Sequence, residues 1–237
     1  MNSFNRVIFS VVAISLLFFA MSAAAQIDKK PYSEWSEKEA QKILNNSAWS
    51  QTQTVTDTSG TFNSGGIQQR RSGSGDVVNV NFRVRFFSSK PVRQAFSRLI
   101  EIQQKEKLSE PVAAQLKALS EVEFSDHIVI SIDCDAPTAT NKLQLAKAAL
   151  MTSTAAEFKN NTYLLTKDGE RLYVQDYQKP GKDGFGAKFI FPRMVNGEPY
   201  ITSESDELVF RAQVGNVVSI NVRYKIKDMM FGNKLEY

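Results

Sequence analysis

Apolar and polar residues alternate without exception from Val78 to Phe86, and this pattern predicts a β-strand with one buried face. The same alternation predicts a strand over Val218 to Met229, where every second residue from Ile220 to Ile226 is apolar. Apolar residues lie on both faces for part of His127 to Cys134, as expected in the middle of a sheet. A sheet is therefore the predicted framework.

Four shorter strands are predicted in the second half of the chain. Two of them flank Lys167 to Glu170, where an Asp-Gly pair between apolar runs is typical of a hairpin. In chain order, the four strands are Tyr163 to Thr166, Arg171 to Asp176, Ala187 to Phe191 and Glu207 to Val214. Their short and regular spacing favours antiparallel pairing.

A first helix is predicted near the beginning of the chain. Ser33 or Ser36 can cap it, and Asn45-Asn46-Ser47 ends it. Glutamates in its early turns stabilise such a helix, because their negative charge interacts favourably with the positive end of the helix dipole. Its apolar stripe consists of Trp35, Ala40, Ile43 and Leu44.

Proline positions and helical spacing predict three further helices. The second begins at Pro91 and the third follows Pro111, because proline is favoured in a first helical turn. The fourth covers Thr138 to Phe158, with Thr138 as its cap. Their apolar stripes are, in order, Val92, Phe96, Leu99 and Ile100; Leu116 and Leu119; and Leu143, Ala146 and Leu150.

Helices in the first half and hairpins in the second predict an α+β fold, with a mainly antiparallel sheet packed with two to four helices. Residues 51–76 are rich in Ser, Thr and Gly and predict a loop with one weak strand at Thr52 to Thr56. The predicted organisation is a signal peptide at 1–25, an N-terminal helix segment at 26–50, the loop at 51–76 and an α+β domain at 77–237.

Residues 1–25 have the pattern of a secretory signal peptide. Arg6 precedes an apolar run from Val7 to Met21, and small residues at Ala23 and Ala25 fit cleavage before Gln26. The run is shorter than the about 20 apolar residues of a membrane span. We therefore expect an exported protein, periplasmic or extracellular, without a later transmembrane segment. An uncleaved N-terminal anchor is the alternative.

The net charge and the cysteine count of the chain limit which partners and which stabilising bonds we expect. The formal charge is +4 and falls to +3 without Arg6, the only charge among the first 25 residues, so we expect no nucleic-acid partner. Cys134 is the only cysteine, which rules out an internal disulfide. Stability must therefore come from packing.

The sequence contains no complete catalytic set. His127 and Cys134 lie seven positions apart on one predicted strand, on opposite faces and more than about 20 Å apart by strand rise. Asp133 and Asp135 lack the spacing of a calcium loop, and we favour a role in solvating a loop and capping a helix. We expect no metal and no cofactor. Whether the protein is an enzyme stays open, because Asp126, Asp133 or Asp135 could serve a carboxylate-dependent hydrolase.

Five cations occur on the polar faces of the two alternating strands. If these strands pair in one sheet, their cations share an exposed face that can bind phospholipid, lipopolysaccharide or an acidic glycan. The alternative is a solvated face in which Glu207 or Glu123 lies among the cations. The five candidates are Arg83, Arg85, Arg223, Lys225 and Lys227.

Both tryptophans of the chain, Trp35 and Trp49, flank the first predicted helix. They are candidate binding residues if the protein presents this segment to a partner. The stripe that Trp35 shares with Ile43 and Leu44 instead favours packing against the domain. Packing is the interpretation that we prefer.

Two stretches carry a resemblance to a known group of proteins. The first is the W-S-x-K-E-A-x-K-I-L-N-x-S-x-W segment from Trp35 to Trp49, and the second is Phe191-Pro192-Arg193 followed by DELVFRAQVG and VRYKIKDMMFGNKLEY. Together they look like uncharacterised exported bacterial proteins associated mainly with Acidobacteria and their relatives. Where that group often has proline, this chain has Ala48. The resemblance implies an envelope or secreted location and supplies no activity or substrate.

These observations predict a secreted or periplasmic protein with a binding or structural role in the cell envelope. Its expected partner is an envelope protein or an anionic envelope surface. A carboxylate-dependent hydrolase and a small-ligand carrier are the alternatives. Acids that converge in a cleft would favour the hydrolase, whereas scattered acids would favour a binding role.

Overall fold

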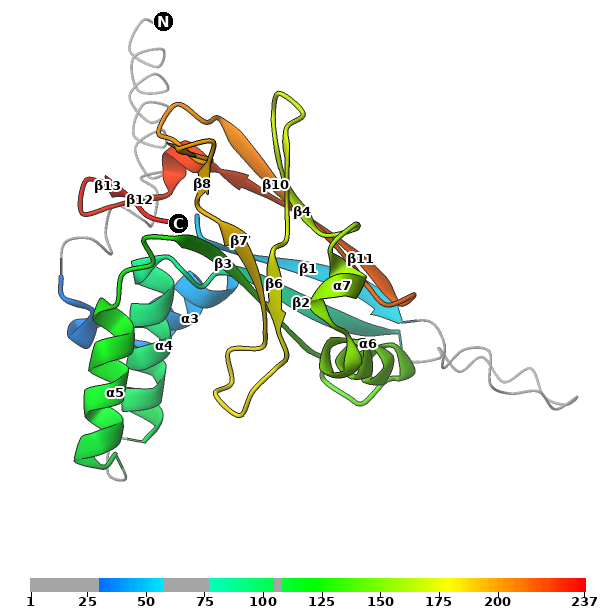
Figure 1. Ribbon diagram of the computed structural model, residues 1–237. Coiled ribbons are helices and arrows are strands. Elements are labelled where there is room, and N and C mark those ends of the chain that lie inside the picture. The colour runs from blue at the N-terminus through cyan, green and yellow to red at the C-terminus, as the bar shows by residue number, and fades with distance from the viewer. Residues whose placement is uncertain (1–29, 58–76, 105–107) are drawn as a thin grey trace, which may run out of the picture.

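The computed structural model describes residues 30–57, 77–104 and 108–237, so the predicted signal peptide and most of the predicted loop lie outside the described residues. Two antiparallel sheets form its framework (Figure 1). The first has five strands, which are, in spatial order, β1 (Ser50–Asp57), β2 (Val78–Phe86), β3 (His127–Asp135), β7 (Ala187–Pro192) and β6 (Asp176–Gln178). The second has four, which are β11 (Val218–Lys225), β10 (Glu207–Val214), β4 (Tyr163–Thr166) and β5 (Arg171–Tyr173).

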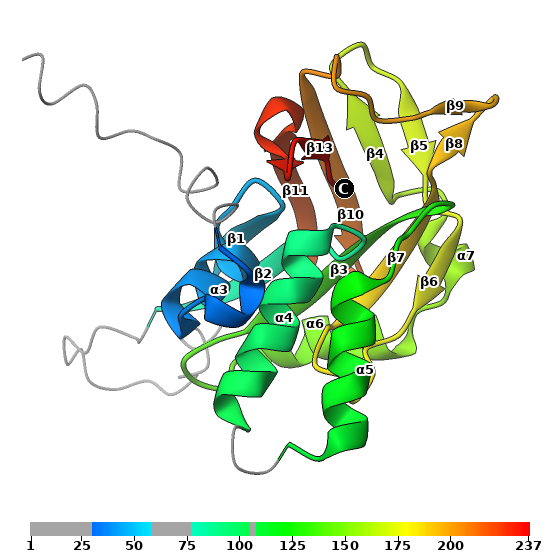
Figure 2. The same cartoon turned by 90° about the vertical axis from the view of Figure 1, so that its left-hand side faces the viewer.

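Five α-helices and two small hairpins complete the described part of the chain. Three helices lie side by side against the five-stranded sheet (Figure 2), namely α3 (Glu37–Asn45), α4 (Lys90–Gln103) and α5 (Glu110–Glu121). At the other end of the molecule are α6 (Asn141–Thr152) and α7 (Ala155–Phe158). The hairpins are β8 (Met194–Val195) with β9 (Glu198–Pro199), and β12 (Met230–Phe231) with β13 (Lys234–Leu235). The α+β prediction is confirmed.

The main core lies between the two sheets. Alternate residues of β2 and β11 face inward, and the rings of Phe86 and Tyr224 meet edge to face with centroids 4.8 Å apart. The Tyr224 hydroxyl donates a hydrogen bond to the Val84 carbonyl, 2.9 Å away. Phe189 and Phe210 join the sheets further along, with ring centroids 5.8 Å apart. The inner faces of both sheets are thereby used for packing, and only their outer faces are left for other contacts.

Strand β1 confirms the weak strand predicted at Thr52 to Thr56 and extends it to Ser50 and Asp57, while residues 58–76 of the predicted loop lie outside the described residues. It pairs with β2 along its whole length, although its composition is Ser, Thr and Gln rather than apolar. Cross-strand side-chain bonds replace apolar contacts, since the hydroxyl groups of Thr54 and Thr56 bond to Asn81 and Asn79 over 2.9 and 3.2 Å. The polar composition therefore indicated a shorter strand than the one that pairs with β2.

Three predicted elements end earlier than the sequence indicates. The helix predicted over 138–158 is α6 and α7, because Thr154 and Glu157 form a capping box that begins a new helix, and the cap of α6 is Thr140 rather than Thr138. The strand predicted over 171–176 is β5 and β6, which belong to different sheets. The last predicted strand ends at Lys225, where a 3-10 helix, η3 (Ile226–Asp228), takes over.

The two sheets meet at a seam between their edge strands β1 and β11. The Gln53 amide nitrogen donates to the Ser219 carbonyl, and its amide oxygen accepts from the Asn221 backbone N–H, each over 2.8 Å. One side chain therefore bonds to the backbone of β11 in the way that a neighbouring strand would.

Candidate functional site

The five predicted cations do not share one face. Arg83 and Arg85 lie on β2 in the five-stranded sheet, whereas Arg223 and Lys225 lie on β11 in the four-stranded sheet, and Lys227 lies on η3. The condition for a shared face, that the two strands pair in one sheet, is therefore not met. Alternation shows which side chains point away from the core, but it does not show which strands are neighbours.

Arg83 and Arg85 bind carboxylates of the neighbouring strand β3. Arg83 pairs with Asp133 over 3.1 Å and also with Asp135, while Arg85 pairs with Asp133 over 2.9 Å. Burial opposes ionisation, yet the hydrogen bond with Asp135 and the charge of Asp133 raise the pKa of Arg83. At Arg85, burial outweighs Asp133 and lowers the pKa. Both arginines are thus already engaged inside the protein.

Helices α3 and α4 cover Arg85, which is only 3% exposed. Its Nε donates to the Leu44 carbonyl near the end of α3 over 2.6 Å, and its guanidinium group lies 5.3 Å from the centre of the Phe96 ring on α4. A carbonyl near a helix C-terminus is a favourable partner for a cation. Arg85 therefore connects helices α3 and α4 to the five-stranded sheet.

The candidate carboxylates do not converge. Asp133 and Asp135 pair with arginines on the sheet, which corrects the prediction that they solvate a loop and cap a helix. Asp126 precedes the first residue of β3, about 23 Å from Asp133 by strand rise. Within the described residues, no group of three or more His, Cys, Asp or Glu side chains is placed to hold a metal ion. Asp133 and Asp135 thus share Arg83, whereas Asp126 lies apart from them, so the three candidates do not form one site.

His127 and Cys134 lie on one strand, β3, as the sequence predicts. Seven residues separate them, so they are about 23 Å apart by strand rise and cannot act together. Burial raises the pKa of the Cys134 thiol to about 11, which keeps it protonated near neutral pH.

Both tryptophans are buried. Trp35 and Trp49 each meet the Phe231 ring edge to face, with centroids 6.4 and 6.1 Å apart. The Trp49 indole N–H donates to the Glu236 carbonyl over 2.9 Å. These contacts join the first helical segment to the β12–β13 hairpin, and they support the packing interpretation.

The outer face of the four-stranded sheet is a candidate binding surface, and we name it the Arg-Tyr face. Its residues occupy every second position of β4, β5, β10 and β11, opposite to the positions that fill the core. Among the described helices, none lies over this side of the sheet (Figures 1 and 2). The Arg-Tyr face consists of Tyr163, Leu165, Arg171, Tyr173, Glu207, Val209, Arg211, Gln213, Ser219, Asn221, Arg223 and Lys225.

Arginine and tyrosine side chains interlock on this face. The rings of Tyr163 and Tyr173 are 5.5 Å apart, and the Arg171 guanidinium group lies 4.8 Å from the centre of the Tyr163 ring. Arg171 donates to the Tyr173 hydroxyl over 3.4 Å, and Arg211 donates to the Tyr163 hydroxyl over 3.5 Å. These long hydrogen bonds orient the guanidinium groups and leave both of them exposed to solvent.

Positive charge on the Arg-Tyr face is only partly balanced. Arg171, Arg211, Arg223 and Lys225 face one carboxylate, Glu207, which gives a net formal charge of +3. Glu207 lies 3.3 Å from the Nε of Arg223. Between described residues of this face, that is the one ion pair. Arg171 and Arg211 therefore carry charges whose only hydrogen-bond acceptors on the face are phenols.

Lys225 and Lys227 line a hollow at one end of the Arg-Tyr face. The hollow has a volume of about 240 Å³, and Lys167, Asp206 and Glu207 complete its lining. Lys167 and Asp206 form an ion pair over 2.7 Å. Glu207 lies among these predicted cations, whereas Glu123 lies beside Lys234.

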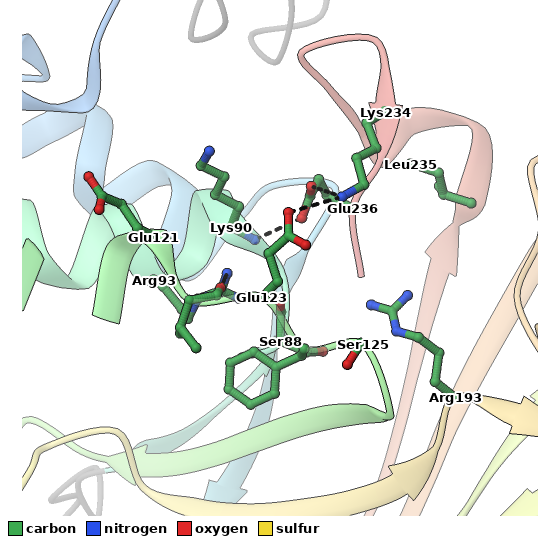
Figure 3. A pocket seen from close by; sticks show the side chains of 12 residues that line it. Ser88, Lys90, Arg93, Glu121, Glu123, Ser125, Arg193, Lys234, Leu235 and Glu236 are labelled. Atoms are coloured by element: carbon green, nitrogen blue, oxygen red, sulfur yellow. Dashed lines mark hydrogen bonds and ion pairs between the residues drawn. The ribbon is translucent and has the colours of Figure 1, made fainter. Parts of the chain in front are cut away.

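A second polar site is a pocket of about 170 Å³ at the beginning of α4 (Figure 3). The Glu236 carboxylate accepts from the Lys90 backbone N–H over 3.2 Å, in the position of an anion at a helix N-terminus. The ammonium group of Lys234 lies 3.6 and 3.7 Å from the carboxylates of Glu123 and Glu236. Much of the charge in this pocket is paired internally.

Two arginines also line the pocket. Arg93 is 2% exposed and donates to the Leu119, Val122 and Ser88 carbonyls. Burial lowers its pKa to about 10, so it stays charged near neutral pH. Arg193 points into the pocket (Figure 3) and bonds to the Tyr237 carbonyl, while its buried Nε has no hydrogen-bond partner among the described residues. The buried Nε of Arg193 is therefore a donor in this pocket that no described residue satisfies, whereas the guanidinium groups on the Arg-Tyr face are exposed to solvent.

Four of the residues on the Arg-Tyr face, Tyr163, Arg171, Tyr173 and Arg211, were missed by the sequence analysis. They belong to three strands, and only the register brings them together. Alternation within Glu207 to Val214 was the available signal, because it places Arg211 opposite to the core positions. The neighbours of Arg211 could not be inferred without the strand order.

Comparison of the chain with protein-family models, with curated proteins and with solved structures finds no match. The resemblance to exported bacterial proteins stays a prediction. No helix in the described part of the chain is long and apolar enough to cross a membrane.

Proposed function

We propose that this protein is an exported binding protein of the cell envelope, and that it holds an anionic envelope component on the Arg-Tyr face. The observation that carries the proposal is the exposure of Arg171 and Arg211, which have tyrosine hydroxyls rather than carboxylates as hydrogen-bond partners. Export rests on the signal-peptide pattern of residues 1–25.

The arrangement favours an anionic ligand for two physical reasons. An exposed guanidinium group without an internal carboxylate can accept an external one without first breaking an ion pair. The tyrosine contacts also restrict Arg171 and Arg211 before a ligand arrives, which lowers the entropy lost on binding. Arg83 and Arg85 lack both advantages, because β3 already supplies their carboxylates.

The alternatives receive weaker support. A hydrolase needs two carboxylates in one site, and Asp133 is held between two arginines. A small-ligand carrier could use the pocket at the beginning of α4, but Glu236 already occupies the helix N-terminus there. The Arg-Tyr face requires no rearrangement of this kind.

Two triple variants of equal net charge test the proposal. The face variant is R171Q/R211Q/R223Q, and the control is K117Q/K147Q/K182Q, which removes three exposed lysines elsewhere. Binding of the purified full-length protein to anionic phosphatidylglycerol vesicles and to polygalacturonate is measured at low salt. The face variant should bind on the order of 100-fold more weakly, since each cation near an anionic surface contributes about 1 kcal/mol.

The control triple should stay within about twofold of the unchanged protein, because only the position of its lost charges differs. Equal weakening of both variants would attribute binding to overall charge and would overturn the proposal. Absence of binding to both ligands would overturn it as well.

A further inference from the structure

We infer that the ligand of the Arg-Tyr face is an extended polysaccharide whose sugars carry carboxylates, an inference that rests on the proposed function. Three features of the face carry it: the spacing of its arginines, the orientation of its tyrosines and the neutral polar side chains beside them. Together they match the carboxylates, the ring faces and the hydroxyl groups of an acidic glycan.

The arginines are arranged for a ligand that crosses the strands. Arg223 on β11 and Arg171 on β5 lie at opposite ends of one row of cross-strand partners, with Val209 and Leu165 between them. Three strand spacings separate the ends, which is about 14 Å. Arg211 lies in the next row. Since a guanidinium fork pairs best with a planar carboxylate, a chain with carboxylates at intervals can engage several arginines at once.

The tyrosines offer amphipathic contact area. Tyr173 is 41% exposed, and Tyr163 beside it is half-buried. A tyrosine ring supplies a rigid apolar surface together with a hydroxyl group, at little cost in side-chain entropy. Sugars likewise combine apolar C–H surface with hydroxyl groups. The apolar ring and the hydroxyl group of a tyrosine can therefore each contact a matching part of a sugar.

Neutral polar side chains lie in the adjacent rows. Asn221 faces Arg211 across β10 and β11, and Ser219 faces Gln213 in the following row. Amide and hydroxyl groups both donate and accept hydrogen bonds, as sugar hydroxyls do. This group of side chains can therefore bond to the hydroxyl groups of an acidic glycan.

The same contacts disfavour nucleic acid and membrane. Single-stranded nucleic acids stack their bases on free aromatic faces, but Arg171 covers Tyr163, and the two tyrosine rings are tilted by 56° to each other. Membrane surfaces are bound by exposed apolar side chains together with cations, yet Val209 is buried and Leu165 is half-buried. Nucleic acid and lipid therefore enter the experiment as competing ligands.

Four probes distinguish the ligand classes, with titration calorimetry on the full-length protein. They are polygalacturonate, its methyl ester with the same backbone and no charge, phosphatidylglycerol vesicles and a single-stranded oligonucleotide. Polygalacturonate should bind most tightly, and its methyl ester at least about tenfold more weakly, because the arginines lose their carboxylate partners. Equal binding of the ester, or tighter binding of vesicles or oligonucleotide, would overturn the inference.

Variants at Tyr173 test the ring independently of charge. Y173A should weaken polygalacturonate binding about fivefold or more, whereas Y173F, which keeps the ring and loses only the hydroxyl group that accepts from Arg171, should weaken it less than Y173A does. Thermal unfolding of both variants controls for loss of fold. Equal binding by Y173A and the unchanged protein would remove the tyrosines from the site and overturn the inference.

The outcomes separate this inference from the proposed function. If vesicles or oligonucleotide bind tightly and the triple face variant abolishes that binding, the Arg-Tyr face is an anion site for another ligand and only the inference fails. If no anionic probe distinguishes the face variant from the lysine control, the proposed function fails too.

Discussion

The outer faces of the two sheets use arginine in opposite ways. On the five-stranded sheet, Arg83 and Arg85 lie beneath or beside helices and pair with carboxylates of the next strand. On the four-stranded sheet, Arg171 and Arg211 lie in solvent and bond to tyrosines. Outward-facing arginines on a strand therefore have two possible roles, and the layer outside the sheet decides between them.

The difference arises from what each sheet meets on its outer side. Helices α3 and α4 desolvate Arg85, and a desolvated charge must be paired and hydrogen-bonded to be tolerated. Where the described chain places no helix over a sheet, water solvates the cation and no internal carboxylate is required. Of the two outer sheet faces in the described part of the chain, the Arg-Tyr face is therefore the one that can leave arginines without a carboxylate, and there they are available to a ligand.

The strongest test of this comparison is Arg85→Ala. It removes a buried cation, leaves the Leu44 carbonyl without its donor and deprives Asp133 of one partner. We expect a loss of about 3 kcal/mol in the free energy of unfolding, measured by urea denaturation. A loss below about 0.5 kcal/mol would mean that the covered arginine is as dispensable as a surface one.

Helix α3 supplies the carbonyl that binds Arg85, and its cap gives a smaller test based on pH. A hydrogen bond from Lys30, and further ones from Ser36, lower the pKa of Glu39 from 4.5 to about 2. The Glu39 carboxylate therefore contributes fully to the free energy of unfolding above about pH 4.5, and this contribution is lost as the pH falls towards 2. Glu39→Gln should cost about 1 kcal/mol or less near neutral pH, because the carboxylate is partly exposed.

That cost of Glu39→Gln should shrink steeply as the pH falls to about 2, where about half of the native carboxyl groups are protonated. Glu37→Gln is the matched control, since it removes another carboxylate from the first turn but leaves the capping box intact. A penalty that does not change with pH would attribute the effect to the side chain rather than to its charge.

The smallest expected effect is that of Arg211→Gln on stability. Its guanidinium group is exposed and makes only one long hydrogen bond, so the free energy of unfolding should change by less than about 0.5 kcal/mol. The measurement is urea denaturation under the conditions used for Arg85→Ala. A loss of several kcal/mol would show that the exposed arginines are structural, which would remove the contrast between the two faces.

Sequence patterns predicted the bounds of individual strands better than they predicted which strands pair with each other. The bounds of β2 and β10 agree with the prediction because one face of each strand packs into the core, and the residues of that face alternate with polar residues at all positions but Val209. Pairing depends on contacts between distant segments, such as β3 with β7, and these contacts leave no mark in a local pattern.

The candidate site could be predicted only in part for the same reason. Arg223 and Lys225 were identified from alternation, but the tyrosines that orient the other arginines come from β4 and β5. The expectation that Arg83 and Arg85 share an exposed face failed because the sequence does not reveal that α3 and α4 cover Arg85, or that β3 supplies carboxylates to both arginines. Coverage is a tertiary property, and residue spacing does not encode it.

The glutamine at the seam bears on how copies of this chain meet one another. An edge strand with free N–H and carbonyl groups is a template for a strand of a second molecule. Gln53 occupies two such groups on β11, at Ser219 and Asn221, without adding a strand. These two backbone groups are therefore bonded within the chain and are not available to an edge strand of a second molecule.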